Sequence, residues 1–269
     1  MTEPVFQHLA ALGSSFASGP GIDPVIDRMA GRSARNYPHL VAEGLGAQLT
    51  DLTVSGATTA NVLDTPQRVL NHTFPPQLDG LPADADLVTI TVGGNDLGNG
   101  LTTILAGVVG RLLSPIPVAG LGSSLVRRFR PARSEDVIDR AATTLVQIVD
   151  IVRARTGGAR VLVVGYLTVF GDDSRPGPEL PFDVAAIDDF RRRGEQVQEV
   201  LARAAAKSGA EFIDAGAASR SHAVGSAEPW VLGMTPLRSV VETVPYHPNA
   251  AGMAAVAELI LTHLRTSGS

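Results

Sequence analysis

Short apolar runs alternate with stretches of helical periodicity along most of the chain, and this alternation restricts the fold more than any other feature. The clearest runs are Val5–Gly13, Gln48–Val54, Leu87–Val92, Val161–Val164 and Glu211–Ile213. Apolar runs of this kind are typical of strands that are buried on both faces. Five such strands separated by helices predict a parallel sheet with helices on both sides.

Four segments carry the helical spacing that this fold requires. Glu135–Arg155 has apolar residues at i, i+3 and i+4 positions, and Tyr37–Leu45, Phe190–Ala206 and Ala250–Leu264 follow the same period. We therefore expect one α/β domain over residues 1–269, a three-layer, flavodoxin-like sandwich around a central five-stranded parallel sheet.

Three irregular stretches follow strands and interrupt the alternation. They are Gly98–Arg133, Phe170–Phe182 and Ser219–Val244. The first holds more apolar surface than a connection needs, which predicts a lid or pocket insertion at about 98–133, although packing into the core would explain it nearly as well. In open α/β sheets ligands lie beyond the carboxyl ends of the strands, so these stretches are expected to wall a pocket there.

Composition excludes several classes of protein. With 44% hydrophobic residues in 269, the chain can bury a large core, which excludes disorder for its bulk. A net charge of −5 argues against a nucleic-acid partner. The arginine run at 191–193, in a predicted helix, is interpreted as solvent-exposed. The chain has no cysteine, so disulfides, thiolate nucleophiles and cysteine zinc sites are excluded.

Other patterns bear on cofactors and location. The sequence has no GxxxxGK[ST], no GxGxxG after the first strand and no HExxH, so no nucleotide, other cofactor or metal is expected. No apolar run is long enough to predict a membrane span. The first residues lack the basic start and apolar run of a secretory signal, and a cytoplasmic location is expected.

Four short polar segments stand at strand exits or before the last helix. They are Gly13-Ser14-Ser15, Ser55-Gly56, Gly93-Gly94-Asn95-Asp96 and His247-Pro248-Asn249 with Gly252. A serine at a strand exit can expose its hydroxyl, a glycine can present an unhindered N–H, and an asparagine can donate to an oxyanion. Taken singly, each segment is more typical of a turn or a helix cap.

Taken together and in this order, the four segments resemble the SGNH hydrolases, also called GDSL esterases and lipases. The resemblance runs from Leu12 to the last helix, and GGND and HPNxxG are its most specific motifs. It implies the SGNH hydrolase fold and a carboxylic-ester hydrolase acting on a small-molecule or lipid acyl ester. Ser15 would be the nucleophile and His247 the general base. The oxyanion hole would consist of the N–H groups of Ser15 and Gly56 and the Asn95 side chain.

Two positions depart from the family's pattern. Ser14 stands where the family has aspartate before the nucleophile, and we expect altered hydrogen bonding there with the chemistry retained. Val244 stands where the family has an aspartate three residues before the histidine, the carboxylate that orients the imidazole. The carbonyl of Pro245 could orient the ring in a Ser–His dyad, as in some family members, and Glu242 is a second candidate.

Two other functions are also compatible with the sequence. An acyltransferase would pass the acyl group to a sugar or another alcohol. A non-catalytic protein that binds lipids or glycans would explain Val244. We favour the catalytic Ser–His dyad over the binding protein because all three oxyanion donors are present, which a pure binding protein would not need.

Overall fold

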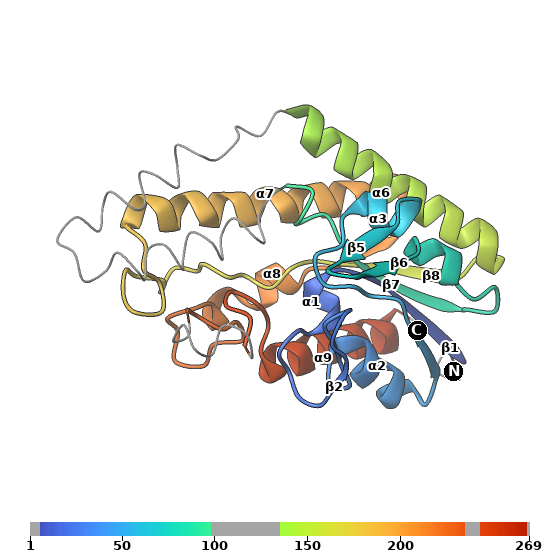
Figure 1. Cartoon of the computed structure of the whole chain (residues 1–269), viewed down its shortest axis with the longest axis horizontal. Helices are drawn as coiled ribbons and strands as arrows, with labels where there is room; N and C mark the ends of the chain where they lie inside the picture. Colours follow the sequence, from blue (N-terminus) through green and yellow to red (C-terminus); the bar gives the residue numbers. More distant parts are fainter. Residues whose placement is uncertain (1–5, 98–134, 235–242, 268–269) are drawn as a thin grey trace.

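The structure, a computed structural model, describes residues 6–97, 135–234 and 243–267. Its centre is a five-stranded, all-parallel sheet in the order β4–β1–β7–β8–β9 (Figure 1). In chain order these strands are β1 (His8–Gly13), β4 (Gln48–Asp51), β7 (Leu87–Thr91), β8 (Arg160–Val164) and β9 (Glu211–Ile213). The predicted five-stranded parallel sheet is therefore confirmed, with strands close to their expected bounds.

The central strands are covered on both faces. Every residue of β1 and of β7 is buried, and the two pair in register, with Leu12 opposite Ile90. This double burial explains why these strands read as continuous apolar runs without a polar alternation.

Two helices pack against one face of the sheet (Figure 1). Helix α2 (Tyr37–Leu45) begins at Asn36, whose side chain accepts from the His39 N–H. Helix α9 (Ala250–Thr266) begins at Asn249, whose side chain accepts from the Gly252 N–H. Both are standard N-caps, and the second fixes the chain just after His247.

Helices α3 (Thr59–Leu63), α6 (Glu135–Thr156) and α7 (Val184–Ser208) cover the opposite face (Figure 1). Helix α7 begins earlier than the sequence predicts, at Val184 instead of Phe190. The side chain of Asp183 accepts from the Ala186 N–H, so it caps a turn of helix that the apolar spacing does not reveal.

The remaining elements are short. They are α1 (Ser15–Ser18), α8 (Ala215–Ala218), the 3-10 helices η1 (Gln77–Gly80) and η2 (Arg220–His222), and two hairpins, β2 (Val25–Asp27) with β3 (Arg32–Ser33) and β5 (Gln67–Val69) with β6 (His72–Phe74). The hairpins were not predicted, because strands of two or three residues carry no periodic signal.

The strand order reverses between β1 and β7. After β1 the chain moves to β4 on one side, and then returns to β7 on the other. Such a reversal leaves a crevice at the carboxyl ends of the two strands, where open α/β sheets bind ligands. Ser15 follows β1 and Asn95 follows β7, so both lie at this edge. The predicted insertion at about 98–133 lies outside the described residues.

Candidate active site

The end of β1 turns sharply because Gly13 packs against the neighbouring strand. Its φ is +153°, and a Cβ there would lie 2.6 Å from the carbonyl oxygen of Thr91. The Gln77 side chain accepts from the Gly13 N–H at 2.7 Å and donates to the Gly13 carbonyl at 2.9 Å. The Ser14 N–H then donates to the Thr91 carbonyl. Ser15 follows as the first residue of α1, only 6% exposed.

The segment that holds His247 is fixed by backbone hydrogen bonds. The Tyr246 N–H donates to the Leu232 carbonyl, and the Leu232 N–H donates to the His247 carbonyl, at 2.8 and 2.9 Å. Gly252 lets the start of α9 approach this segment closely, because a Cβ there would lie 2.3 Å from the carbonyl oxygen of Trp230. The glycine of HPNxxG is therefore required by close packing between α9 and the 230–232 segment.

Ser15 and His247 lie within hydrogen-bond distance of each other. His247 Nε2 lies 2.9 Å from Ser15 Oγ, and His247 Nδ1 lies 2.9 Å from the carbonyl oxygen of Pro245. A carbonyl can only accept, so Nδ1 carries the ring proton and Nε2 accepts from the serine hydroxyl. This is the arrangement in which a neutral imidazole removes a hydroxyl proton.

Burial keeps the imidazole neutral. Desolvation lowers the pKa of His247 below its usual value of 6.5, and the hydrogen bond to Pro245 opposes this shift only in part. A base with a lowered pKa is unprotonated at neutral pH, so it is ready to accept a proton.

The predicted oxyanion donors lie on three neighbouring segments. Asn95 Nδ2 donates to the Ala57 carbonyl at 2.9 Å, which uses one of its two amide hydrogens and leaves the other. Asp96 accepts from the N–H and the hydroxyl of Thr59 at the start of α3. The segment after β7 is therefore tied to the one that contains Gly56.

The three donors differ in whether they line the cavity that opens beside Ser15 and His247. Ser15 and Asn95 line it together with His247, whereas Gly56 is not among the described residues that line it. Gly56 precedes Ala57 and has a φ of +83°, a conformation that favours glycine. Within the described residues, the N–H groups of Ser15 and Gly56 donate to no protein acceptor.

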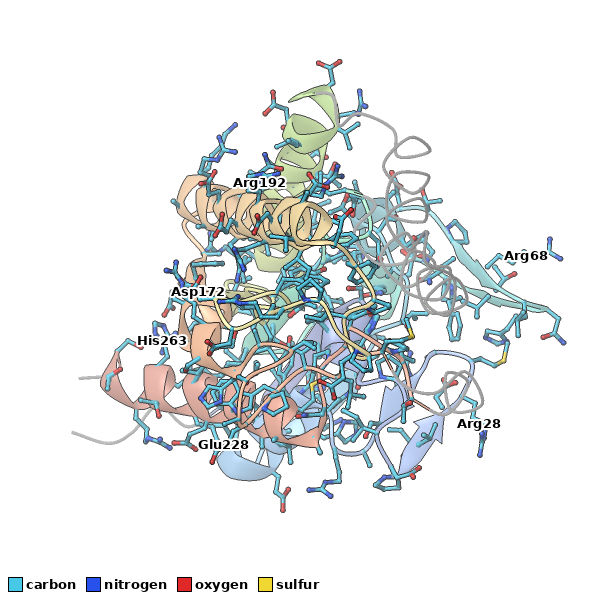
Figure 2. All side chains as sticks on the ribbon, turned by 90° about the vertical axis from the view of Figure 1, so that its left-hand side faces the viewer. Arg28, Arg68, Asp172, Arg192, Glu228 and His263 are labelled. Atoms are coloured by element: carbon cyan, nitrogen blue, oxygen red, sulfur yellow. The ribbon has the colours of Figure 1, made fainter. Side chains whose placement is uncertain are left out.

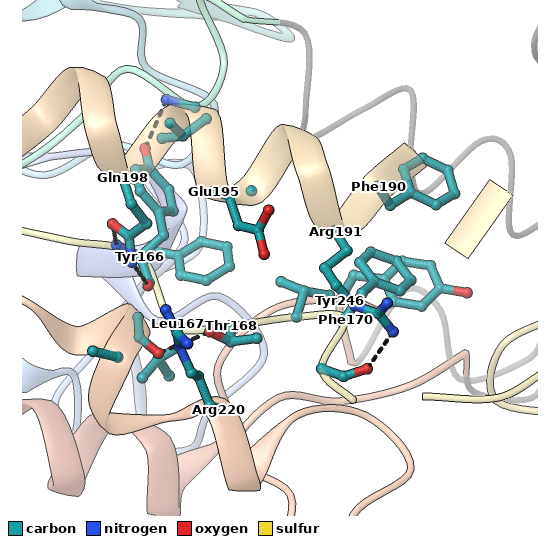
Figure 3. A pocket seen from close by; sticks show the side chains of 18 of the residues that line it. Tyr166, Leu167, Thr168, Phe170, Phe190, Arg191, Glu195, Gln198, Arg220 and Tyr246 are labelled. Carbon is teal, nitrogen blue, oxygen red and sulfur yellow. Dashed lines mark hydrogen bonds between the residues drawn. The ribbon is translucent and has the colours of Figure 1, made fainter. Parts of the chain in front are cut away.

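A cavity of about 410 Å³ opens beside Ser15 and His247. Phe170, Phe190 and Tyr246 form an aromatic wall on one side (Figure 3). Glu195 of α7 and Arg220 of η2 also line the cavity (Figure 3). A cavity of this size and mixed character can hold a small ligand with apolar and polar parts.

The arginine run of α7 was wrongly interpreted as uniformly exposed. Arg192 is exposed, because 65% of its side chain is accessible on the outer face of the helix (Figure 2). Arg191 instead lines the cavity, where it donates to the Gly171 carbonyl at 2.7 Å and pairs with Asp188 at 3.0 Å. Neighbouring positions on a helix point about 100° apart, so a run of like residues need not share one environment.

Of the two candidates for orienting His247, Pro245 lies within hydrogen-bond distance of Nδ1. Glu242 lies outside the described residues. The Ser14 hydroxyl lies 3.2 Å from Tyr166 Oη and 3.4 Å from the Thr91 carbonyl oxygen.

Two residues at this edge were missed by the sequence analysis. Tyr166 follows β8, and its position after a parallel strand is a signal that was available. The Phe16 ring lies between Tyr166 and His247, with ring centroids 4.8 and 5.4 Å away. Nothing in the sequence distinguishes Phe16 from an ordinary core residue.

Metal sites and membrane-spanning helices are both absent from the described part of the chain. Within residues 6–97, 135–234 and 243–267, no three His, Asp or Glu side chains gather in a way that could hold a metal ion. None of the helices in those ranges is long and apolar enough to cross a membrane.

Known proteins resemble this chain over most of its length. The sequence profile of the GDSL-like Lipase/Acylhydrolase family matches residues 11–255. Lipase 2 of Streptomyces coelicolor is 34% identical over 252 residues, which cover 92% of this chain and 82% of that protein.

Solved structures agree in fold. An extracellular lipase from Streptomyces rimosus matches with a TM-score of 0.70 and 25% identity, over 96% of this chain and 99% of that one. A phospholipase A1 from Streptomyces albidoflavus has the same TM-score at 22% identity, over 97% and 99% of the two chains.

Proposed function

The chain belongs to the GDSL-like lipase/acylhydrolase family, and from this premise we propose that it hydrolyses carboxylic esters through an acyl-enzyme on Ser15. The observation that carries the proposal is the 2.9 Å contact between Ser15 Oγ and His247 Nε2, in a histidine whose other nitrogen already donates to Pro245. This arrangement supports a Ser–His dyad oriented by a main-chain carbonyl.

In the first half of the reaction, Ser15 Oγ attacks the ester carbonyl while His247 Nε2 takes the hydroxyl proton. The tetrahedral oxyanion is held by the N–H groups of Ser15 and Gly56 and by the Asn95 amide. Removal of one such donor typically costs about 2.7–4 kcal/mol of transition-state stabilisation. The bond to the alcohol then breaks, and His247 returns its proton to the leaving oxygen.

In the second half, water replaces the alcohol. His247 takes a proton from the water as the water oxygen attacks the acyl-enzyme. It then gives this proton to Ser15 Oγ as the bond between Oγ and the acyl carbon breaks, which releases the carboxylic acid and restores the serine hydroxyl. The aromatic wall of Phe170, Phe190 and Tyr246 favours an acyl ester with an apolar part. Small-molecule and lipid acyl esters both fit this chemistry.

The test is turnover of p-nitrophenyl esters from acetate to palmitate by the wild type, Ser15→Ala and His247→Ala. Ser18→Ala is the matched control, because Ser18 is a buried serine of the same short helix whose hydroxyl has no partner in the described part of the chain. We expect the wild type and Ser18→Ala to hydrolyse the esters. We expect Ser15→Ala to lose roughly 10⁶-fold in kcat with little change in Tm.

Two outcomes would contradict the proposal. Full turnover by Ser15→Ala would remove the nucleophile from the mechanism. Absence of turnover by folded wild type with every ester would reject hydrolysis, and product analysis with mixed alcohol acceptors would then test the acyltransferase. An acyltransferase would form new ester faster than free acid.

A further inference from the structure

The hydroxyl of Tyr166 joins the two segments that carry the proposed oxyanion donors. The Gly94 N–H donates to Tyr166 Oη at 3.0 Å, and Tyr166 Oη lies 3.2 Å from Ser14 Oγ. Gly94 precedes Asn95, and Ser14 precedes Ser15. Tyr166 Oη therefore contacts the residue before Asn95 and the residue before Ser15.

The direction of the hydrogen bonds follows from the chemistry of the groups. A backbone N–H can only donate, so Tyr166 Oη accepts from Gly94. The Thr91 carbonyl can only accept, so Ser14 donates to it over the longer distance of 3.4 Å. The arrangement that satisfies every group has the Tyr166 proton donated to Ser14 Oγ.

Tyr166 is itself held in place. The Gln198 side chain accepts from the Tyr166 N–H at 3.1 Å and donates to the Tyr166 carbonyl at 2.6 Å (Figure 3). The ring of Phe16 packs beside the Tyr166 ring. Burial raises the pKa of Tyr166 to about 12, so its hydroxyl stays protonated over the range in which enzymes are assayed.

The segment after β7 is held from two sides. Asn95 and Asp96 bond the segment of Ala57 and Thr59, which belongs to the β4 side of the sheet. Gly94 bonds Tyr166, which belongs to the β8 side. Without the second bond, the described side-chain hydrogen bonds of this segment would tie it only to the Gly56 side, and the position of Asn95 relative to Ser15 would be less well defined.

We propose that Tyr166, supported by Ser14, is a positioning residue that holds the Gly94–Asn95 segment so that the Asn95 amide is aligned with the oxyanion formed at Ser15. The proposal rests on the proposed function. It also accounts for Ser14, because a neutral hydroxyl can accept from Tyr166 while donating to Thr91, whereas a carboxylate would face the Thr91 carbonyl without a donor.

The first test compares Tyr166→Phe with Tyr37→Phe. Each removes only a hydroxyl, from the partly buried Tyr166 or from the buried Tyr37, whose hydroxyl bonds the Thr91 side chain at 2.8 Å and not Gly94. For Tyr166→Phe we expect kcat to fall between about 10- and 100-fold with KM unchanged, since the oxyanion exists only beyond the ground state. For Tyr37→Phe we expect kcat within about twofold of wild type. Equal kcat in both variants would overturn the proposal.

The second test asks whether Tyr166 acts through Asn95. Asn95→Ala alone should lower kcat by about 10²–10³. If Tyr166 only aligns that amide, adding Tyr166→Phe should lower kcat by no more than about a further twofold. If Tyr166→Phe lowered kcat by the same factor in the Asn95→Ala background as in the wild type, its effect would be structural and the positioning role would be rejected.

A third measurement separates this inference from the proposed function. Hydrogen exchange of the Gly94 amide, followed by NMR, needs no substrate. Loss of its acceptor in Tyr166→Phe should raise the exchange rate by about fivefold or more, with no change in Tyr37→Phe. If the wild type hydrolyses no ester, the proposed function fails on its own, and an unchanged Gly94 exchange rate would reject the contact that this inference needs.

Discussion

His247 donates its Nδ1 proton to the main-chain carbonyl of Pro245, over a distance of 2.9 Å. In the common serine triad a carboxylate side chain occupies this place and fixes the tautomer. Here the backbone two residues earlier does so, and Val244 takes the position at which the family has an aspartate. A backbone oxygen cannot be removed by a side-chain substitution, so the orientation of the ring depends on the fold of the loop itself.

The first prediction concerns Glu242. A neutral imidazole has one ring proton, and Pro245 already receives it, so no carboxylate is needed at Nδ1. We expect Glu242→Gln to keep kcat within about twofold of wild type, while His247→Ala loses activity. Steady-state kinetics with one p-nitrophenyl ester tests this. If Glu242→Gln lowered kcat by 100-fold or more, which corresponds to about 2.7 kcal/mol, the orienting role would belong to that carboxylate.

The second prediction concerns the pH dependence of activity. Because burial lowers the pKa of His247, the free enzyme reaches its active, neutral form below the ordinary histidine value. We expect kcat/KM to rise with pH, to have its midpoint below 6.5, and to be level by neutral pH. Acid release followed by chromatography avoids the pH-dependent colour of p-nitrophenol. A midpoint above 7 would contradict the burial argument.

The same residue gives a prediction about stability. An unfolded His247 titrates near 6.5, and the folded one titrates lower, so between the two values the unfolded chain binds more protons. The stability that this histidine contributes is therefore fully present above about 6.5 and is lost as pH falls through the folded value.

Thermal unfolding of the wild type and His247→Gln at pH 7.5 and 5.0 measures this contribution. Glutamine does not titrate, so the other groups of the chain cancel in the comparison. We expect the Tm of the wild type to fall more than that of His247→Gln between the two pH values. Equal decreases would mean that His247 titrates alike in both states.

The sequence predicted those parts of the molecule whose signal is local. Apolar runs and helical spacing identified the central sheet and four of its covering helices (α2, α6, α7 and α9), because burial on both faces of a strand or along one stripe of a helix leaves a periodic pattern. The end of a helix depends instead on single side chains. Asp183 extends α7 beyond its predicted start, and nothing in the apolar pattern marks it.

Some residues of the candidate site are also predicted by local sequence motifs, and others are not. Ser15, Asn95 and His247 stand in short motifs at strand exits or a helix start, so their convergence on one cavity follows from the parallel topology. Tyr166 and Gln77 act on backbone groups 72 and 64 residues away, at Gly94 and Gly13. The place of Tyr166 after a strand is visible in the sequence, but the distant backbone partner of a single polar side chain is not, and only the folded chain reveals it.

The last prediction concerns Gln77, which is 4% exposed and pairs with both backbone groups of Gly13. Gln77→Leu keeps much of the volume but leaves the buried Gly13 N–H without an acceptor, whereas the Gly13 carbonyl still accepts from Val54. We expect a loss of about 2 kcal/mol in the free energy of unfolding, measured with urea.

In Gln77→Glu, the ionised carboxylate accepts from the N–H but faces the Gly13 carbonyl without a donor, which disfavours the charged form. Its pKa should rise on folding, so the stability of Gln77→Glu relative to wild type should improve as pH falls. A stability difference that stays constant between pH 7.5 and 5.0 would show that this carboxylate does not face the carbonyl, and the paired geometry at the end of β1 would be wrong.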